Sequence, residues 1–217
     1  MTAMPNAPET PGVVIGNTTK KYTAKNPAIR WLTERWVTRL DEVIARTTRD
    51  AHAPRNPLEV GCGEGVISQR LHGRFGRCVS IDLPDAGLRA EWRERPGPAY
   101  LHADALRLPF GDDAFDLIVC VEVLEHLTDP AAGLRELARV SSRHLVLSVP
   151  REPIFRGSNL LAGRYVKDLG NTPGHLNHWS AAGFQRFASH VGSIREVATP
   201  FPWTILWVTL DPVTKRG

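Results

Sequence analysis

Apolar residues recur in two rhythms along the chain. From Asn26 onward they repeat at spacings of three and four, as on one face of a helix, and Asn26 and Pro27 suit the first positions of a helix. From Pro57 onward, short runs rich in Val, Ile and Leu alternate with helical stretches, which predicts a mostly parallel sheet with connecting helices. Strands are expected near residues 57–61, 77–82, 98–102, 115–121, 143–149, 194–199 and 203–210.

The connections between these strands complete the prediction. Helices are expected near residues 64–73, 85–94 and 129–140, and a last one from Ser180. Pro200-Phe201-Pro202 separates the final two strands and is too short for a crossover helix, so these strands should pair antiparallel. The fold class is therefore α/β, with a mixed sheet of seven strands and an N-terminal helical cover.

Two segments depart from the regular pattern. Residues 1–50 are expected to form a loose arm followed by the cover helix, and residues 51–217 the main domain. Within that domain, residues 151–179 are Gly-rich, mixed in charge and longer than a typical connection. We expect this stretch to be a lid or a substrate-binding segment.

Composition restricts the class of protein further. The net charge is +4, but the Arg and Lys residues are scattered among Asp and Glu and form no basic stripe. No nucleic-acid partner is therefore expected. No apolar run could span a bilayer, and the first residues lack a secretory pattern, so a cytoplasmic protein is expected. Cys62, Cys78 and Cys120 show no CxxC spacing and are expected to be buried thiols. The sequence is compatible with a homo-oligomer or a partner subunit.

The strongest chemical signal is the run from Glu59 to Gly65, where a strand ends in glycines that open a helix. Glycines allow a sharp turn and a close approach of the backbone to a ligand, and the helix N-terminus presents free N–H groups. Asp82 ends the next strand, where an acidic residue can accept both ribose hydroxyl protons of an adenosine. A nicotinamide cofactor would use the same geometry, but its fingerprint requires glycine where this chain has Val66.

Further runs follow in a fixed order. They are His102-Ala103-Asp104-Ala105 with Leu108-Pro109-Phe110, then Phe115 to Cys120, then Glu122-Val123-Leu124-Glu125-His126. In this combination the sequence resembles the class I S-adenosylmethionine-dependent methyltransferases, in the small-molecule group related to the ubiquinone and menaquinone methyltransferases. The resemblance covers about residues 57–150 and implies a Rossmann-like, doubly wound sheet. It also implies S-adenosylmethionine as the cofactor and S-adenosylhomocysteine as its product.

The resemblance assigns the cofactor site by position. It implies that the glycines surround the methionyl part, that Asp82 holds the ribose, and that Asp104 accepts from the adenine amino group. The implied cofactor-binding residues are Tyr22, Glu59, Gly61, Cys62, Gly63, Gly65, Asp82, Leu83, Asp104, Ala105 and Glu122. Three alternatives stay open. Asp104 could simply cap a turn, Glu122 could be a solvated residue at the strand end, and Tyr22 could anchor the N-terminal arm instead of closing over the cofactor.

Three histidines are candidates for a general base, because the pKa of imidazole lies near working pH. His126 follows the fourth strand, and His175 and His178 precede the last helix. His126 could instead bond a neighbouring loop, and the other two could pin the lid. No metal site is expected, because Gly174 and the absence of a nearby carboxylate or Cys cluster disfavour ligation by the His175 and His178 pair.

Aromatic side chains could furnish an apolar substrate pocket; they are Trp31, Phe155, Tyr165, Trp179, Phe201 and Trp203. The leading hypothesis is methyl transfer to O, N or C of a small molecule, such as a secondary metabolite or a lipid-like intermediate. Two alternatives keep the fold, namely a non-methylating cyclisation or elimination enzyme and a non-catalytic cofactor-binding partner subunit.

Overall fold

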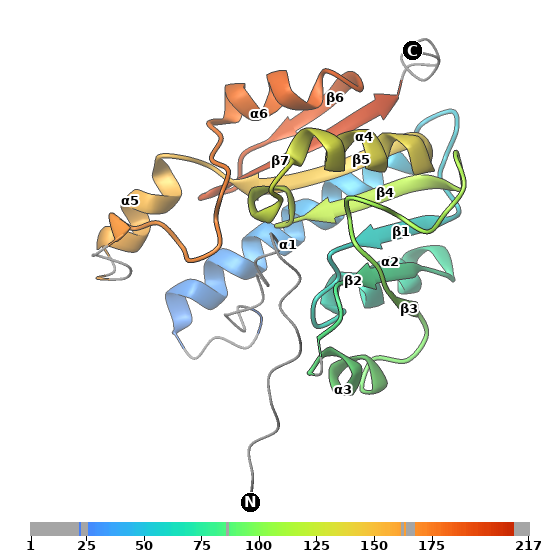
Figure 1. The fold of residues 1–217 in the computed structure, drawn as a ribbon, viewed down its shortest axis with the longest axis horizontal. Coiled ribbons are helices and arrows are strands. Elements are labelled where there is room, and N and C mark those ends of the chain that lie inside the picture. Colours follow the sequence, from blue (N-terminus) through green and yellow to red (C-terminus); the bar gives the residue numbers. More distant parts are fainter. Residues whose placement is uncertain (1–21, 23–25, 86, 162, 164–167, 211–217) are drawn as a thin grey trace, which may run out of the picture.

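A seven-stranded sheet forms the centre of the protein (Figure 1). The computed structural model describes residues 22, 26–85, 87–161, 163 and 168–210. The strand order is β3-β2-β1-β4-β5-β7-β6, with β7 antiparallel to both of its neighbours. The strands are β1 Pro57–Val60, β2 Val79–Asp82, β3 Ala99–His102, β4 Phe115–Val121, β5 Ser141–Pro150, β6 Gly192–Ala198 and β7 Trp203–Leu210. The predicted α/β fold with antiparallel last strands is confirmed.

The strand order reverses direction next to β1. The chain runs from β1 outward to β2 and β3, then returns to place β4 on the other side of β1, so β1 pairs in parallel with both β2 and β4. Connections therefore leave the carboxyl ends of β1 and β4 in opposite directions and open a crevice between them. Ligands of open α/β sheets bind at such a switch point.

Helices cover both faces of the sheet. They are α1 Pro27–Thr47, α2 Val66–Phe75, α3 Leu88–Arg93, α4 Pro130–Val140, α5 Ile154–Leu161 and α6 Ala181–Ala188, with a 3-10 turn η1 at Leu124–His126. Along β4 the side chains alternate, with Leu117 and Val119 facing α1 and α2 while Ile118 and Cys120 face α4 and α6. Figure 1 shows α1 behind the sheet and α4 in front of it.

Helix α1 begins as the sequence predicts. The Asn26 side chain accepts a hydrogen bond from the Ala28 backbone N–H, and Pro27 occupies the first turn. Its apolar stripe, which includes Trp36 and Leu40, is buried against the sheet. Within the described residues, no helix has the length and apolar character needed to cross a membrane. The predicted N-terminal arm, residues 1–20, lies outside the part of the chain that the structure describes.

Two elements differ from the sequence prediction. The stretch 151–179 contains α5, whose Gly157 and Ser158 favour helices weakly. The Asn159 side chain attaches α5 to the following loop by donating to the Gly170 carbonyl at 2.9 Å, a tertiary contact that local periodicity does not reveal. The predicted helix over 85–94 is shorter, because Gly87 stands at its N-cap without a side-chain acceptor.

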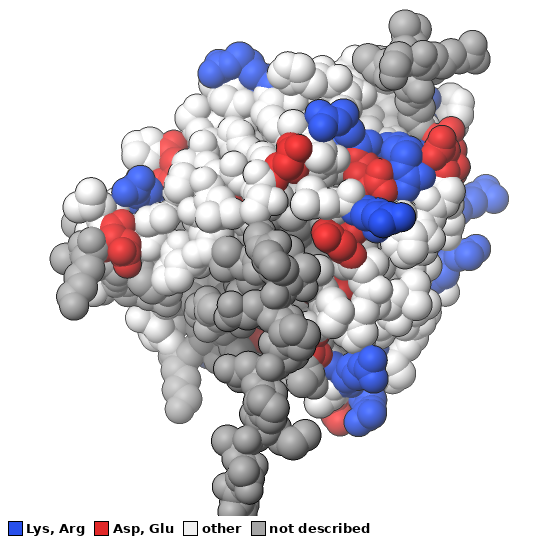
Figure 2. All heavy atoms as spheres, in the orientation of Figure 1, with Lys and Arg blue, Asp and Glu red and all other residues white. Residues whose placement is uncertain are grey.

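Surface charge is mixed. Figure 2 shows one face of the molecule, on which basic and acidic side chains of the described residues lie interspersed. Arg139, for example, binds both Glu136 and Asp112 and joins α4 to the loop before β4. Cys62, Cys78 and Cys120 are buried free thiols, as the sequence predicts.

Candidate functional site

The glycine turn follows β1 and leads directly into α2. Gly61, Gly63 and Gly65 all adopt positive φ angles, of 77°, 49° and 82°. A Cβ atom on Gly61 would lie 2.1 Å from a Val123 methyl carbon, and one on Gly65 would lie 2.6 Å from the Tyr100 hydroxyl oxygen. Glycine is therefore required here both by backbone conformation and by close packing.

Asp82 connects the end of β2 to this turn. One carboxylate oxygen accepts from the Gly63 N–H at 2.6 Å, and the other accepts from the Leu83 N–H at 2.7 Å. Burial raises the pKa of Asp82, while these two N–H donors oppose the shift. Each carboxylate oxygen accepts more than one hydrogen bond, so both can still receive a hydroxyl donor. Asp82 is thus a positioned acceptor at the crevice between strands.

Glu59 lies beneath the turn. Its side chain is 1% exposed and accepts a hydrogen bond from the Ser68 hydroxyl of α2. Burial raises the pKa of Glu59 to about 8, although the hydrogen bond from Ser68 opposes the shift. Burial, together with the charge of Glu59, also raises the pKa of the Cys62 thiol, so this cysteine stays protonated. A cation bound next to Glu59 would favour the carboxylate form.

Tyr22 and Glu122 lie at the same end of the sheet. The pKa of Tyr22 is raised, first by burial and then by the negative charges of Glu59, Glu122 and Glu64. Tyr22 therefore lies close to the carboxyl ends of β1 and β4. Glu122 follows β4 with a positive φ of 59°, and its carboxylate accepts from the Trp203 indole N–H at 2.8 Å. The structure thus brings two predicted residues from distant parts of the sequence to one region.

Asp104 caps a turn after β3. Its carboxylate accepts from the Leu106 N–H at 2.9 Å, and its backbone carbonyl accepts from Arg107. Neighbouring Ala105 packs against the core cluster that includes Leu108. In the structure Asp104 therefore caps a turn, as the alternative interpretation of this residue predicts.

An aromatic group beside the turn was not predicted. The Trp92 indole N–H donates to the Gly63 carbonyl at 2.9 Å, and its ring stacks on Tyr100 with centroids 5.0 Å apart. The His102 ring lies 4.8 Å from Trp92. The period-two spacing of Tyr100 and His102 on one face of β3 was the available signal. The Trp92 hydrogen bond holds the backbone of the glycine turn at Gly63.

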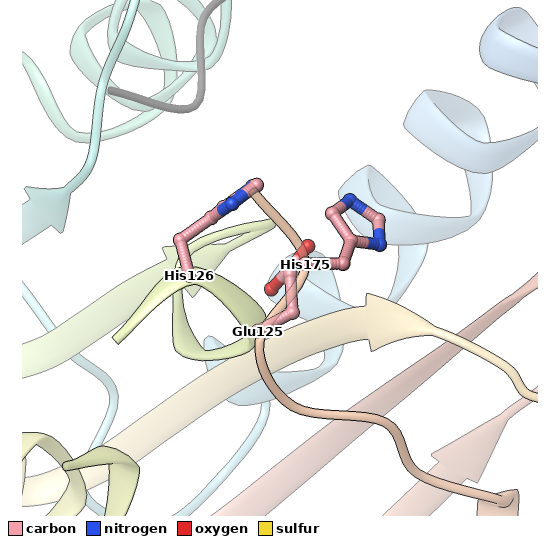
Figure 3. A group of neighbouring side chains, drawn as sticks. All are labelled: Glu125, His126 and His175. Carbon is pink, nitrogen blue, oxygen red and sulfur yellow. The ribbon is translucent and has the colours of Figure 1, made fainter. Parts of the chain in front are cut away.

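The structure separates the three candidate histidines. His126, in η1, bonds the Gly174 carbonyl through Nδ1 at 2.9 Å, and its ring centroid lies 4.9 Å from that of His175. Figure 3 shows both rings beside the Glu125 carboxylate. His178 instead bonds the Asn171 side chain at 2.7 Å in an exposed position. His126 and His175 therefore form one group, and His178 is not part of it.

The sequence argument against a metal rested on the absence of a carboxylate near these histidines. That premise is wrong, because Glu125 is buried next to His126 and His175, with one ligand atom from each of the three residues within 4.8 Å of the others. Glu125 stood in the run Glu122 to His126, and no role was assigned to it. Glu125 and His175 are 50 positions apart in the sequence, so their proximity is not visible in local spacing.

The candidate aromatic residues have different surroundings. Phe155 packs against both Trp203 and His175, so it lies at the site. Trp31 and Phe201 are 53% and 46% exposed, and Trp179 packs on Phe184 of α6. Tyr165 lies outside the described residues. Phe155 and Trp203 are thus the aromatic candidates that the structure brings to this end of the sheet.

Known proteins match both the sequence and the fold. Residues 58–144 match the family described as "Methyltransferase domain". A "probable S-adenosylmethionine-dependent methyltransferase" of Mycobacterium tuberculosis is 28% identical over 160 residues, which are 68% of this chain and 58% of the relative. A ubiquinone biosynthesis O-methyltransferase of Stutzerimonas stutzeri is 24% identical over 181 residues, covering 76% of this chain and 72% of that protein.

Solved structures agree on the fold. The magnesium protoporphyrin IX methyltransferase of Synechocystis, solved with bound S-adenosylhomocysteine, superposes with a TM-score of 0.63 and 20% identity, covering 87% of this chain and 89% of that one. Residues 58–144 are therefore similar to a methyltransferase domain. The predicted resemblance to class I S-adenosylmethionine-dependent methyltransferases is confirmed, and the fold agrees with it. The chain spans 58% of the length of the mycobacterial relative.

Proposed function

We propose that this protein transfers a methyl group from S-adenosylmethionine to an oxygen, nitrogen or carbon atom of a small molecule, such as a secondary metabolite or a lipid-like intermediate. The observation that carries the proposal is the contact of Asp82 with Gly63, which joins a ribose acceptor to the glycine turn at the strand switch point. The named activities of the methyltransferase relatives support the same reaction type.

The cofactor would lie across the carboxyl ends of β2, β1 and β4. In this proposal Asp82 and Leu83 hold the ribose, the turn from Gly61 to Gly65 with Cys62 holds the methionyl part, and Asp104 with Ala105 borders the adenine. Glu59 and Glu122 provide negative charge near the cationic end of the cofactor, and Tyr22 closes over it. The shared influence of Glu59 and Glu122 on the pKa of Tyr22 supports this arrangement.

The chemistry requires little from the protein beyond alignment. A sulfonium methyl group is already electrophilic, so the enzyme must hold the nucleophile in line with the carbon–sulfur bond and exclude water. A hydroxyl or ammonium acceptor must also lose a proton. His126 and His175 are the proposed catalytic histidines, whereas the bond of His178 to Asn171 favours its role as a support of the loop.

The acceptor is proposed to contact residues 151–179. This segment carries α5 and passes over η1, where its Leu176 and Asn177 N–H groups donate to the Glu125 carbonyl. Phe155 supplies an apolar surface beside His175. We also propose a cytoplasmic location, a reducing compartment in which free thiols such as those of the three cysteines persist.

The purified protein tests the proposal directly. S-Adenosylhomocysteine should raise the melting temperature, while NAD should leave it unchanged, and incubation with S-adenosylmethionine and an acceptor panel should yield S-adenosylhomocysteine and a methylated product in equal amounts. At 100 times Kd, the expected stabilisation is about 2.7 kcal/mol. Stabilisation by NAD alone would refute the cofactor assignment. Turnover of an acceptor without consumption of the cofactor would instead establish the non-methylating alternative.

A further inference from the structure

A second group of chemically active side chains lies next to the cofactor region. Glu125 and His126 come from η1 and His175 from the loop before α6, and one ligand atom of each lies within 4.8 Å of the others (Figure 3). Donor atoms on one tetrahedral Zn²⁺ ion lie about 3.4 Å apart, since each bond is about 2.1 Å long. Side-chain rotations that bring the three donor atoms from within 4.8 Å to this separation would close the group around an ion. We propose that Glu125, His126 and His175 bind a divalent transition-metal cation.

The hydrogen bond of His126 prepares its ring for ligation. A carbonyl oxygen only accepts hydrogen bonds, so the contact of Nδ1 with the Gly174 carbonyl at 2.9 Å places the proton on Nδ1. In the neutral ring, Nε2 then carries the lone pair. Metal-binding histidines characteristically donate their other N–H to a carbonyl or carboxylate, which fixes the ring orientation and the tautomer.

The loop that carries His175 is attached to η1 by several bonds. The N–H groups of Leu176 and Asn177 donate to the Glu125 carbonyl at 2.8 and 3.0 Å. The Asn177 side chain also donates to the Leu127 carbonyl at 2.6 Å and to the Leu124 carbonyl at 3.3 Å. These bonds hold the backbone after His175 against the backbone of η1. The backbone positions of His175 and Glu125 are therefore fixed relative to each other.

The donor set selects the kind of ion. Two imidazoles with one carboxylate suit Zn²⁺ and related transition-metal ions, whereas Mg²⁺ and Ca²⁺ prefer oxygen ligands. Three protein ligands also leave a coordination position open, as in catalytic zinc sites. Glu125 is 1% exposed, and a bound cation would stabilise its carboxylate form in that buried position.

The location suggests what would occupy the open position. Phe155 packs on both His175 and Trp203, and the Trp203 indole N–H donates to Glu122 at the end of β4. If the proposed methyl transfer holds, His126 and His175 serve it as ligands of the ion and not as bases, and an acceptor hydroxyl bound to the ion loses its proton to solvent. The resulting oxygen anion would attack the methyl carbon, and the electron pair of the broken carbon–sulfur bond would remain on sulfur in S-adenosylhomocysteine.

Zinc titration of the intact protein tests the site without cofactor or acceptor. After dialysis against a chelator, ZnCl2 should bind in calorimetry at one tight equivalent per chain, and MgCl2 should bind far more weakly. His175→Ala should weaken zinc binding roughly 100-fold or more, since loss of a supporting partner alone costs about 10–100-fold. Glu125→Gln should do the same, but it alters a buried group, so the half-buried His175 provides the decisive variant.

His178→Ala is the matched control. It removes an imidazole from the same loop, but this imidazole bonds Asn171 and is not part of the group of Glu125, His126 and His175. Its zinc affinity should equal that of the parent. Equal zinc binding by the parent and His175→Ala, with both folded by circular dichroism, would overturn the site. The absence of a tight equivalent in the parent would also overturn it.

The role of the ion in turnover is tested separately with a phenolic acceptor. Chelation should reduce formation of the O-methylated product, and ZnCl2 should restore it. Undiminished methylation by zinc-free protein would overturn the acceptor-binding role. Stabilisation by S-adenosylhomocysteine reports on the cofactor site, so a failure of the proposed methyl transfer would be distinguishable from a failure of the metal site.

Discussion

The two acidic residues around the glycine turn differ in the partners that hold them. Asp82 accepts from two backbone N–H groups at the edge of the crevice, while Glu59 is buried below it with a hydroxyl partner. A carboxylate that bonds N–H groups is suited to remain charged and to receive further donors. A buried carboxyl with a raised pKa is sensitive to any charge that arrives nearby. The two residues therefore lead to different predictions.

Asp82→Asn should weaken binding of S-adenosylhomocysteine about 10- to 100-fold, because a hydrogen bond to a charged group contributes about 1.5–3 kcal/mol. Asparagine keeps one acceptor oxygen, so the turn is disturbed less than by alanine. Calorimetric titration measures the affinity. Asp85→Asn, in the loop after β2, is the matched control, since its carboxylate bonds the Gly87 N–H. Equal affinity of Asp82→Asn and the parent would refute the ribose assignment.

Glu59→Gln should stabilise the cofactor-free protein at high pH. In the unfolded chain Glu59 loses its proton near pH 4.5, but burial raises the pKa in the folded protein to about 8. The protonated carboxyl therefore contributes stability that is complete below pH 4.5, declines above it and is lost by about pH 8. Glutamine has no such proton, so its advantage in unfolding free energy should grow from pH 5 to pH 9 by a few kcal/mol, to order of magnitude. Urea unfolding across this range measures it, and a constant difference would contradict the assignment.

At the scale of elements, the junction of β1 and α2 depends on how closely its backbone approaches the residues after β4. Gly61 combines a φ of 77° with a Cβ position 2.1 Å from Val123, whereas Gly76 has a φ of 72° and open space around its Cβ position. The two glycines share nearly the same backbone strain and differ in packing. Alanine variants at the two positions therefore separate the free-energy cost of backbone strain from the free-energy cost of side-chain overlap.

Gly76→Ala should lower the free energy of unfolding by about 1–2 kcal/mol through backbone strain alone. Gly61→Ala should lower it by a further ~1–3 kcal/mol, because the new methyl group displaces Val123. Denaturant titration of both variants gives the difference. Equal losses would mean that the residues after β4 move away at no cost, and the close approach would then not be a constraint.

The same scale explains what the sequence could predict. Strands β4 and β5 carry apolar runs that are buried along most of their length, and the glycine turn has its own local signature, so each was visible in a short window. Helix α5 was missed because its attachment through Asn159 joins residues 11 positions apart. The partnership of Glu125 with His175 was missed for the same reason, since a fold, and not a spacing, brings them together.

At the scale of the whole molecule, distant segments meet at the carboxyl ends of the strands. Tyr22 precedes the first helix, Glu122 follows β4 and Trp203 begins the last strand, yet all three belong to one region. Parallel strands direct their carboxyl ends to the same edge, so this convergence follows from topology. The positions of the strands could be predicted from the sequence. The position of Tyr22 over the cofactor region was only implied by the family resemblance.

Tyr22→Ala should lower the affinity for S-adenosylhomocysteine roughly tenfold, through loss of aromatic packing over the ligand, and Tyr22→Phe should retain most of it. Trp31→Ala removes an aromatic residue from the exposed face of α1, where Trp31 stacks with Arg35. This control should bind like the parent. If Tyr22→Ala also binds like the parent, Tyr22 anchors the chain and does not cover the cofactor.

The pairing of Trp36 with Trp203 gives the protein an optical property. Their ring centroids lie 5.5 Å apart, Trp36 lies beside Tyr22, and Trp203 donates to Glu122. Indole emission responds to the polarity and charge around the ring, so a cationic ligand in this region would change the light that the pair emits. Replacement of Trp203 by phenylalanine would remove the indole that lies beside Glu122 and should reduce this change. Intrinsic fluorescence would then follow occupancy of the crevice in real time without any attached dye.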